Sequence, residues 1–192
     1  MQKSKNLAVL ILAAGTSSRL GKAKQLLNYK NESLLKIAIK KALKISDNVF
    51  VVLGHKKEEC LKEIEEFDIN ILYNEKYKLG IGSSISFGIS HTKDFSNTMI
   101  LLCDQPFLEF KHLNILKNSI NNKNIIATQY EQNTISTVPA IFPKEYCEEL
   151  LKLKEDKGAK SILNKNICIN IKLEKKQSID IDTQEDLSKL LC

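Results

Sequence analysis

The sequence contains no tryptophan, and aromatic residues make up only 6% of its 192 positions. Proteins that bind single-stranded nucleic acid stack bases on aromatic side chains, so this chain is poorly equipped for that task. Its net charge of +6 comes from lysines spread along the chain rather than from a basic run. We therefore expect a solvated lysine surface that favours anionic ligands, and no nucleic-acid partner.

Long hydrophobic runs are also missing. The apolar segment Leu7–Ala14 is far shorter than the roughly 20 residues that span a bilayer, and the polar residues 1–6 do not resemble an export signal. The cysteines are odd in number and form no C-x-x-C pair, which is typical of reduced, structural thiols. They are Cys60, Cys103, Cys147, Cys168 and Cys192. The sequence predicts a cytoplasmic protein with no membrane partner.

Arginine and histidine are scarce as well. Arg19 is the single arginine among 29 basic residues, and it lies in a loop of small residues where a planar, forked donor can grip phosphate. The three histidines, His55, His91 and His112, match no catalytic-triad or metal-ligand spacing. We expect the histidines to be surface or packing residues, and no residue pattern requires a covalent nucleophile.

Short apolar, β-branched segments alternate with longer stretches of helical periodicity. Strands are predicted at Leu7–Ala13, Asn48–Leu53, Ile69–Tyr73, Thr98–Cys103, Asn124–Tyr130, Thr134–Phe142, Ile167–Leu173 and Ser178–Ile181. Helices are predicted at Glu32–Ile45, Lys56–Phe67, Ser83–His91, Glu109–Asn121, Lys144–Lys152, Ala159–Leu163 and from Gln184 onward. Continuous apolar strands between helices indicate a mostly parallel sheet covered on both faces.

Consecutive extended segments between Tyr130 and Phe142 interrupt this alternation and predict local antiparallel pairing. The expected fold is one three-layer, Rossmann-like α/β domain over residues 1–192, with a mostly parallel mixed sheet. Most glycines and prolines follow the carboxyl ends of predicted strands, the edge at which such sheets bind ligands.

The loop after the first strand, Gly15–Gly21, fits neither common phosphate-binding pattern. Five residues separate its glycines where a P-loop has four, and the second and third glycines of G-x-G-x-x-G are absent. Small residues there can still point backbone N–H groups at an anion, and Arg19 and Lys24 add positive charge. This combination suits a triphosphate. A plain turn capped by Ser17 and Ser18 is the alternative.

Two acidic segments are candidates for metal binding. Asp104 ends a predicted buried strand and precedes Pro106, a placement that suits Mg²⁺, although it also suits an aspartate that opens a turn. Asp180 and Asp182 alternate along a predicted strand and would share one face. Asp182 is the candidate second metal contact, or it serves only the dipole of the last helix.

The residues Thr183 and Asp186 have the spacing of a helix capping box, so we expect Asp186 to be structural.

The run Leu12–Leu27 resembles the signature of the molybdenum cofactor nucleotidyltransferases, MobA-like proteins of the wider sugar-nucleotidyltransferase superfamily with a GT-A-like fold. It is most similar to the cytidylyltransferase branch, because Ala13-Ala14-Gly15 stands where guanylyltransferases carry Ala-Gly-Gly. The resemblance implies that Arg19, Lys24 and Asp104 are catalytic and that Asp104, in an Asp-x-Pro motif, and Asp182 bind Mg²⁺. It assigns nucleotide binding to Leu12, Ala13, Ala14, Gly15, Ser17, Ser18, Asn74, Gly82, Ser83 and Ser84.

The resemblance continues in three later segments. Asn74–Ser84 is similar to a segment that borders the base and ribose, although Glu75 replaces the usual proline. Val138–Pro143 and Asp156–Lys160 correspond to acceptor-side segments, with Thr137-Val138 where many members carry Gly or Gly-His. Within the second of these segments, Lys157 and Gly158 would bind an acceptor phosphate or form a simple surface turn.

The implied reaction is transfer of CMP from Mg-CTP to molybdopterin or its metal-loaded form, with release of pyrophosphate. A molybdenum hydroxylase would be the partner protein. Two alternatives stay open. One is cytidylyl or other nucleotidyl transfer to a different small phosphate such as methylerythritol phosphate. The other is a nucleotide-binding accessory protein for a molybdenum enzyme, without turnover.

Overall fold

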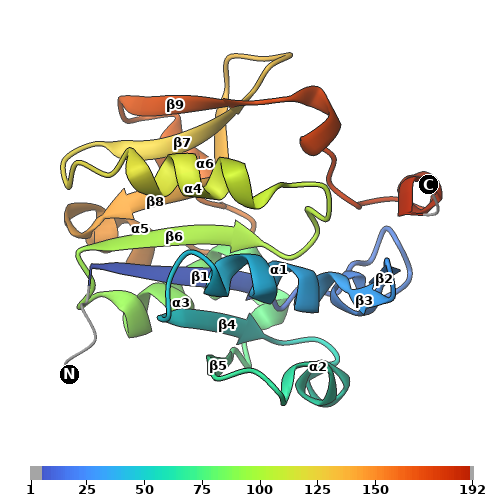
Figure 1. Ribbon diagram of the computed structural model, residues 1–192. Coiled ribbons are helices and arrows are strands. Elements are labelled where there is room, and N and C mark those ends of the chain that lie inside the picture. Colours follow the sequence, from blue (N-terminus) through green and yellow to red (C-terminus); the bar gives the residue numbers. More distant parts are fainter. Residues whose placement is uncertain (1–5, 191–192) are drawn as a thin grey trace.

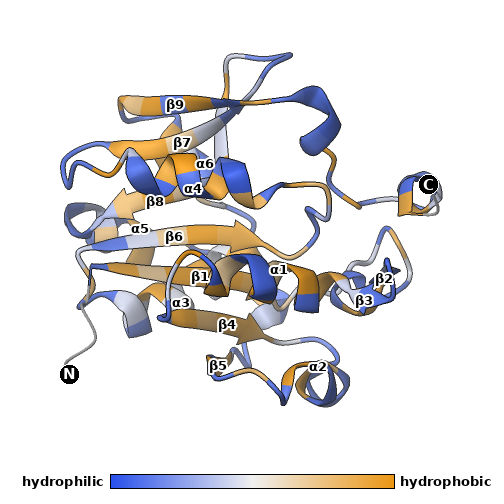
Figure 2. Ribbon diagram, in the orientation of Figure 1, coloured by the Kyte–Doolittle hydropathy of each residue, from blue (hydrophilic) through white to orange (hydrophobic). Residues whose placement is uncertain are grey.

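The two faces of the central strand β1 (Leu7–Ala13) pack against different sets of helices. In the computed structural model, which describes residues 6–190, Val9 and Ile11 belong to one buried cluster, and Leu10 and Leu12 to another. Side chains of a strand alternate between its faces, so a strand that is apolar throughout is buried on both sides. Figure 2 shows the hydrophobic colour along β1 and its neighbours.

The main sheet has seven strands in the order β5-β4-β1-β6-β8-β7-β9. Besides β1 they are β4 (Val49–Leu53), β5 (Asn70–Tyr73), β6 (Asn97–Leu102), β7 (Ile125–Tyr130), β8 (Ser136–Pro143) and β9 (Cys168–Leu173). All neighbours are parallel except β8, which is antiparallel to both β6 and β7. The mostly parallel mixed sheet and the antiparallel pairing between Tyr130 and Phe142 are thus confirmed.

Helices cover both faces of the sheet and give three layers (Figure 1). One cluster takes residues from α1 (Leu34–Leu43), α2 (Lys57–Ile64) and α4 (Phe110–Asn118). The other takes residues from α3 (Ile81–Thr92), α5 (Cys147–Leu151) and α6 (Lys160–Leu163). The described part of the chain also forms 3₁₀ helices at Lys24–Leu26, Tyr77–Leu79, Lys144–Tyr146, Lys175–Gln177 and Glu185–Leu190.

Two predicted helices begin differently in the structure. The helix predicted from Glu32 begins at Leu34, because Glu32 and Ser33 form the short strand β3 (Glu32–Ser33) against β2 (Asn28–Tyr29). The Ser33 hydroxyl then accepts the N–H of Lys36 and caps α1. The segment predicted as a helix from Lys144 starts as a 3₁₀ turn before α5.

The strand predicted at Ser178–Ile181 is wrong. The segment is irregular and joins no ladder; the Ile181 N–H donates instead to the Asp104 carbonyl (3.0 Å) beyond the end of β6. Alternating apolar residues give the same pattern whether or not a partner strand is free. The helix predicted from Gln184 is a 3₁₀ helix at Glu185–Leu190.

The remaining thiols and imidazoles fit structural roles. Cys60 and Cys103 are buried, Cys147 and Cys168 are half-buried, and all four are free thiols; Cys192 lies outside the described residues.

Between residues 6 and 190, no helix combines the length and apolar character needed to cross a membrane.

The imidazole of His112 on α4 is buried. Its Nε2 lies 2.9 Å from Oγ1 of Thr128, whose hydroxyl donates to the Pro139 carbonyl (2.7 Å). The imidazole must therefore donate its Nε2–H to Thr128. Burial lowers the pKa of His112 to about 4, so the ring is neutral at physiological pH, as expected of a packing residue.

Below pH 6.5 the unfolded chain takes up a proton at His112 before the folded protein does. Stability contributed by the neutral ring should be complete above pH 6.5 and decline as the pH falls towards 4, by about 2–3 kcal/mol. Urea unfolding at several pH values measures this slope, and a His112→Gln variant should show a shallower one. Equal slopes in the two proteins would remove His112 as the cause.

Gly88 lets α3 pack closely on β1. A Cβ at position 88 would lie 2.6 Å from both Cδ atoms of Leu10. Gly88→Ala should therefore lower the free energy of unfolding by about 1–3 kcal/mol, although alanine favours helix. Ser90→Ala at an exposed position of α3 is the matched control and should stay within about 0.5 kcal/mol of the parent in urea unfolding.

Candidate active site

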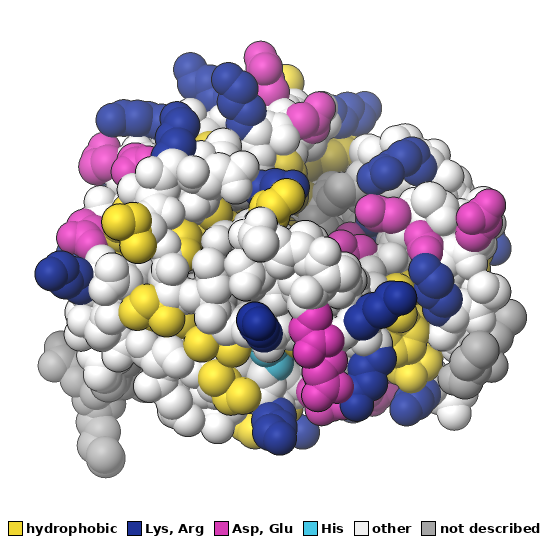
Figure 3. Space-filling view, turned by 90° about the horizontal axis from the view of Figure 1, so that it is seen from above, with side chains coloured by type: hydrophobic (Ala, Val, Ile, Leu, Met, Phe, Trp, Pro, Cys, Tyr) yellow, Lys and Arg dark blue, Asp and Glu magenta, His cyan; other side chains and the backbone are white. Residues whose placement is uncertain are grey.

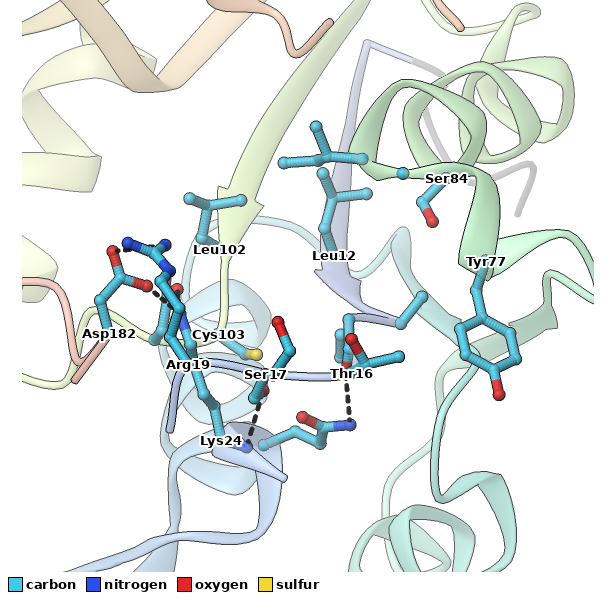
Figure 4. Close-up of a pocket in the computed structure, with 18 of the residues that line it drawn as sticks. Leu12, Thr16, Ser17, Arg19, Lys24, Tyr77, Ser84, Leu102, Cys103 and Asp182 are labelled. Carbon is cyan, nitrogen blue, oxygen red and sulfur yellow. Dashed lines mark hydrogen bonds and ion pairs between the residues drawn. The ribbon is translucent and has the colours of Figure 1, made fainter. Parts of the chain in front are cut away.

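An open cleft of about 460 Å³ lies at the carboxyl ends of β1 and β6 (Figure 4). Because these strands are parallel neighbours, the loops that follow them emerge side by side. The cleft brings together most of the predicted site. Eleven predicted residues line it: Leu12, Ala13, Ala14, Gly15, Ser17, Ser18, Arg19, Lys24, Ser84, Asp104 and Asp182. Three do not, namely Asn74, Gly82 and Ser83.

The loop after β1 is built around a left-handed residue. Ser17 has φ 54°, and its carbonyl accepts the N–H groups of Leu20 (3.0 Å) and Gly21 (3.1 Å). Its hydroxyl accepts the N–H of Lys24 (3.2 Å), so Ser17 also caps the following 3₁₀ helix. Within residues 6–190, the backbone N–H groups of residues 15–19 meet no hydrogen-bond acceptor. Such a run of free donors in a cleft can hold an anion.

The side chain of Gln25 holds the loop after β1 in place. Its buried amide Nε2 donates to the carbonyls of His55 (3.1 Å) and Gly15 (3.5 Å), and the His55 N–H donates to the Ala14 carbonyl (3.1 Å). The loop after β1 is thereby tied to the loop after β4. Sequence reasoning gave Gln25 no role, and its place beside Lys24 was the only available signal.

The cluster of Lys24, Asp104, Asp182 and Arg19, called here the ion cluster, lies at one end of the cleft. Lys24 Nζ is 3.0 Å from Asp104 Oδ2 and also contacts Asp182 Oδ1, while Arg19 Nη2 is 3.5 Å from Asp182 Oδ2 (Figure 4). The Lys24 side chain is 14% exposed and that of Arg19 is 74% exposed. Lys24 is thus a largely buried charge, and Arg19 is an exposed one.

The ammonium of Lys24 stays charged despite its burial. Burial by itself lowers the pKa of Lys24, but the charge of Asp104 and the hydrogen bonds to Asp182 and Asp104 outweigh burial and hold it above its usual value. A buried cation between two carboxylates is stable only while its partners remain ionised.

Asp104 retains binding capacity on its second oxygen. Its Oδ1 is buried and has no hydrogen-bond partner in the described part of the chain. Lys41 holds the segment that follows by donating to the carbonyls of Pro106 (2.8 Å) and Gln105 (3.4 Å). Asp104 and Asp182, which both contact Lys24 Nζ, thus bring two carboxylates together, and such a pair fits a divalent cation.

No group of three acidic, histidine or cysteine side chains is arranged for metal binding in residues 6–190. Magnesium suits such a sparse site, because it takes one or two carboxylates and completes its shell with water and phosphate. The residues present therefore fit Mg²⁺ brought in with a triphosphate.

Asp180 does not share the surroundings of Asp182, because the segment that holds them is not a strand. The Asp180 carboxylate accepts from Gln105 Nε2 (2.9 Å) and Tyr130 Oη (3.5 Å) rather than from Lys24. Burial, with the charge of Asp104, raises the pKa of Asp180 to about 6. Asp180 is therefore a half-buried acid with structural hydrogen bonds.

The capping role predicted for Asp186 is confirmed. Its Oδ2 accepts the N–H groups of Asp182 (3.0 Å) and Thr183 (2.9 Å) and the Thr183 hydroxyl (2.9 Å). The ion pair with Lys189, together with these bonds, holds the pKa of Asp186 well below its usual range. Asp186 thus fixes the backbone from which Asp182 reaches the cleft.

The start of α3 borders the other end of the cleft. Buried Asn74 donates to the hydroxyls of Ser83 (3.2 Å) and Ser84 (3.1 Å), so it positions Ser84 without lining the cleft itself. The close approach expected at Gly82 is to protein rather than ligand, since a Cβ there would lie 2.7 Å from the Lys154 carbonyl. The sequence did not single out nine further lining residues, most of which lie within the segments of the resemblance: Thr16, Gln25, Tyr77, Lys78, Gly80, Ile81, Leu102, Cys103 and Asp156.

A smaller cavity of about 100 Å³ adjoins the cleft and shares Leu12, Ile81 and Leu102 with it. Its wall includes Thr137 and Val138 from β8 and the turn Gly158–Lys160. Both predicted acceptor-side segments therefore border the cleft region, whereas Lys157 lines neither cavity. Figure 3 shows basic and acidic side chains interspersed over the face seen from above, without one basic patch.

Polyphosphate binding tests this geometry directly. Lys24→Met should weaken binding of tripolyphosphate, measured by calorimetry in EDTA, by about 10–100-fold, the loss expected for one hydrogen bond between charged groups. Lys22→Met makes the same charge change at an exposed loop position outside the cleft and should stay within about twofold of the parent. Equal losses in both variants would indicate a diffuse charge effect instead.

The sequence matches a known domain family over most of its length. The family described as MobA-like NTP transferase domain matches residues 9–171. The bifunctional protein GlmU of Ruthia magnifica subsp. Calyptogena magnifica is 31% identical over 107 residues, which are 55% of this chain and 24% of that protein. The chain spans about a quarter of the length of the curated relatives it matches.

Solved structures share the fold at low identity. Rv0371c from Mycobacterium tuberculosis H37Rv has a TM-score of 0.85 at 22% identity, with 97% of both chains covered, and its manganese complex has a TM-score of 0.80 at 20%. The molybdopterin-guanine dinucleotide biosynthesis protein A from Archaeoglobus fulgidus has a TM-score of 0.71 at 15% identity and covers 95% of this chain and 96% of its own. With the match to residues 9–171, the chain belongs to the MobA-like NTP transferase family of nucleotidyltransferases.

Proposed function

We propose that this protein transfers CMP from Mg-CTP to the phosphate of molybdopterin or its metal-loaded form and releases pyrophosphate. The observation that carries the proposal is the ion cluster facing a loop of free backbone N–H groups in one cleft. These are the groups that a triphosphate and its divalent cation require.

The chain's own residues would act mainly by positioning and charge neutralisation. The N–H groups of residues 15–19, together with Lys24 and Arg19, would hold the β- and γ-phosphates. An oxygen of the acceptor phosphate attacks the α-phosphorus in line, and the bond to the bridging oxygen breaks. The electron pair leaves with pyrophosphate, whose developing charge the two cations stabilise.

Asp104 and Asp182 would hold the divalent cation. When bound, that cation adds positive charge beside the α-phosphate and the leaving group, which eases approach of an anionic acceptor. A manganese complex of Rv0371c, a protein of the same fold, supports the use of a divalent cation.

The choice of CTP rests on Ala13-Ala14, the pair that resembles the cytidylyltransferase branch and lines the cleft. The choice of a molybdopterin-type acceptor rests on the family and on the likeness to the Archaeoglobus fulgidus protein. In this proposal the whole chain is one catalytic domain, and a molybdenum hydroxylase receives its product.

Asp104→Asn keeps the size of the side chain but removes its charge, so we expect turnover to fall at least about 10³-fold with the fold preserved. Pyrophosphate release and circular dichroism measure the two quantities. Asp94→Asn changes an exposed aspartate outside the cleft and should keep the parent rate. Near-normal activity of Asp104→Asn would exclude Asp104 from the mechanism.

A matrix of CTP, GTP and ATP against molybdopterin and methylerythritol phosphate, with pyrophosphate as readout, tests the substrates. Release only with CTP and molybdopterin is the expected result. Release with methylerythritol phosphate would support the other cytidylyl acceptor, and nucleotide binding without release in any combination would support an accessory protein.

A further inference from the structure

Lys24 lies in the space between the two carboxylates that are the candidate cation ligands. Its Nζ is 3.0 Å from Asp104 Oδ2 and contacts Asp182 Oδ1, and its side chain is largely buried. A Lys24 ammonium in that position makes the same kind of contacts to oxygen that a bound cation makes. The lysine and a divalent cation therefore compete for the same two carboxylates.

The charges of the ion cluster are already balanced without a metal. Lys24 and Arg19 offset Asp104 and Asp182, with Arg19 Nη2 3.5 Å from Asp182 Oδ2. Adding a divalent cation while both basic side chains stay in place would leave two uncompensated positive charges in a half-buried site. Like charges at such distances repel strongly where water screens them poorly.

A polyphosphate offers Lys24 another anionic partner nearby. The backbone of Lys24 is fixed by the Ser17 hydroxyl, which also belongs to the loop of free N–H donors. The lysine side chain has a flexible four-carbon stem, so Nζ can move to an anion on that loop while the backbone stays in place.

We propose that Lys24 closes the cation site in the free protein, and that polyphosphate opens it by drawing the ammonium away from Asp104 and Asp182. This inference rests on the proposed function only in taking these two carboxylates as the cation ligands. It predicts that a divalent cation alone binds weakly, and that cation and polyphosphate strengthen each other's binding by the same factor.

The test is a Mn²⁺ titration of the whole chain without nucleotide, read by electron paramagnetic resonance of free Mn²⁺. Lys24→Met should bind Mn²⁺ at least about tenfold more tightly than the parent, because the competing cation is gone and two facing carboxylates remain. Lys24→Arg keeps the positive charge in the ion cluster, and Lys22→Met removes a positive charge outside the cleft. Both variants should therefore bind Mn²⁺ as tightly as the parent.

Lys24→Met combined with Asp104→Asn should lose the gain, which locates the Mn²⁺ at the ion cluster. Lys24→Gln is a second neutral variant in case the methionine disturbs folding, as a thermal melt would reveal. Mn²⁺ binding no tighter than in the parent in a folded neutral variant would overturn the proposal, as would a gain that persists with Asp104→Asn. The Mn²⁺ titration uses neither CTP nor an acceptor. Failure to release pyrophosphate in the substrate matrix would therefore count against the proposed function and not against this inference.

Discussion

The contact of Lys24 with Asp104 and Asp182 joins three segments that are distant in sequence. It connects the loop after β1, the end of β6 and the irregular C-terminal segment, which is also held by the Ile181 N–H on the Asp104 carbonyl and by Gln184 on the Leu20 carbonyl. Removing one member would leave another charge half-buried and unpaired, a costly state. The C-terminal segment therefore completes the cleft, and the cleft holds that segment in place.

This cluster depends on the sheet beneath it. The strands β1 and β6 are parallel neighbours, so the loops that follow them start at the same edge. Helices on both faces bury nearly all residues of these two strands. The reactive groups lie on loops, but a buried frame sets where those loops begin. Gln25 also connects these loops, because its side chain donates to Gly15 in the loop after β1 and to His55 in the loop after β4.

Local pattern was most reliable where burial decides structure. The apolar runs of the inner strands and the spacing of the main helices were sufficient to predict the layers and the mixed sheet. The alternating pattern of Ser178–Ile181 predicted another strand, yet the segment does not join the sheet and instead hydrogen-bonds to the Asp104 backbone beside the ion cluster. Alternation reports which residues are apolar, not whether a partner strand is available. Gly82 was likewise predicted to allow close approach of a ligand, whereas the backbone of Lys154 lies against it.

Composition and spacing along the chain were sufficient to predict the α/β class and the small-residue loop, and to nominate the charged side chains Arg19, Lys24 and Asp104. The partners of these side chains depend on the tertiary structure. Within residues 6–190, it set Lys24 between Asp104 and Asp182, left Asp104 Oδ1 without a hydrogen bond, and gave Asp180 other partners than Asp182 has. Contacts between residues some 80 to 160 positions apart follow from strand order and loop path, which no local periodicity encodes.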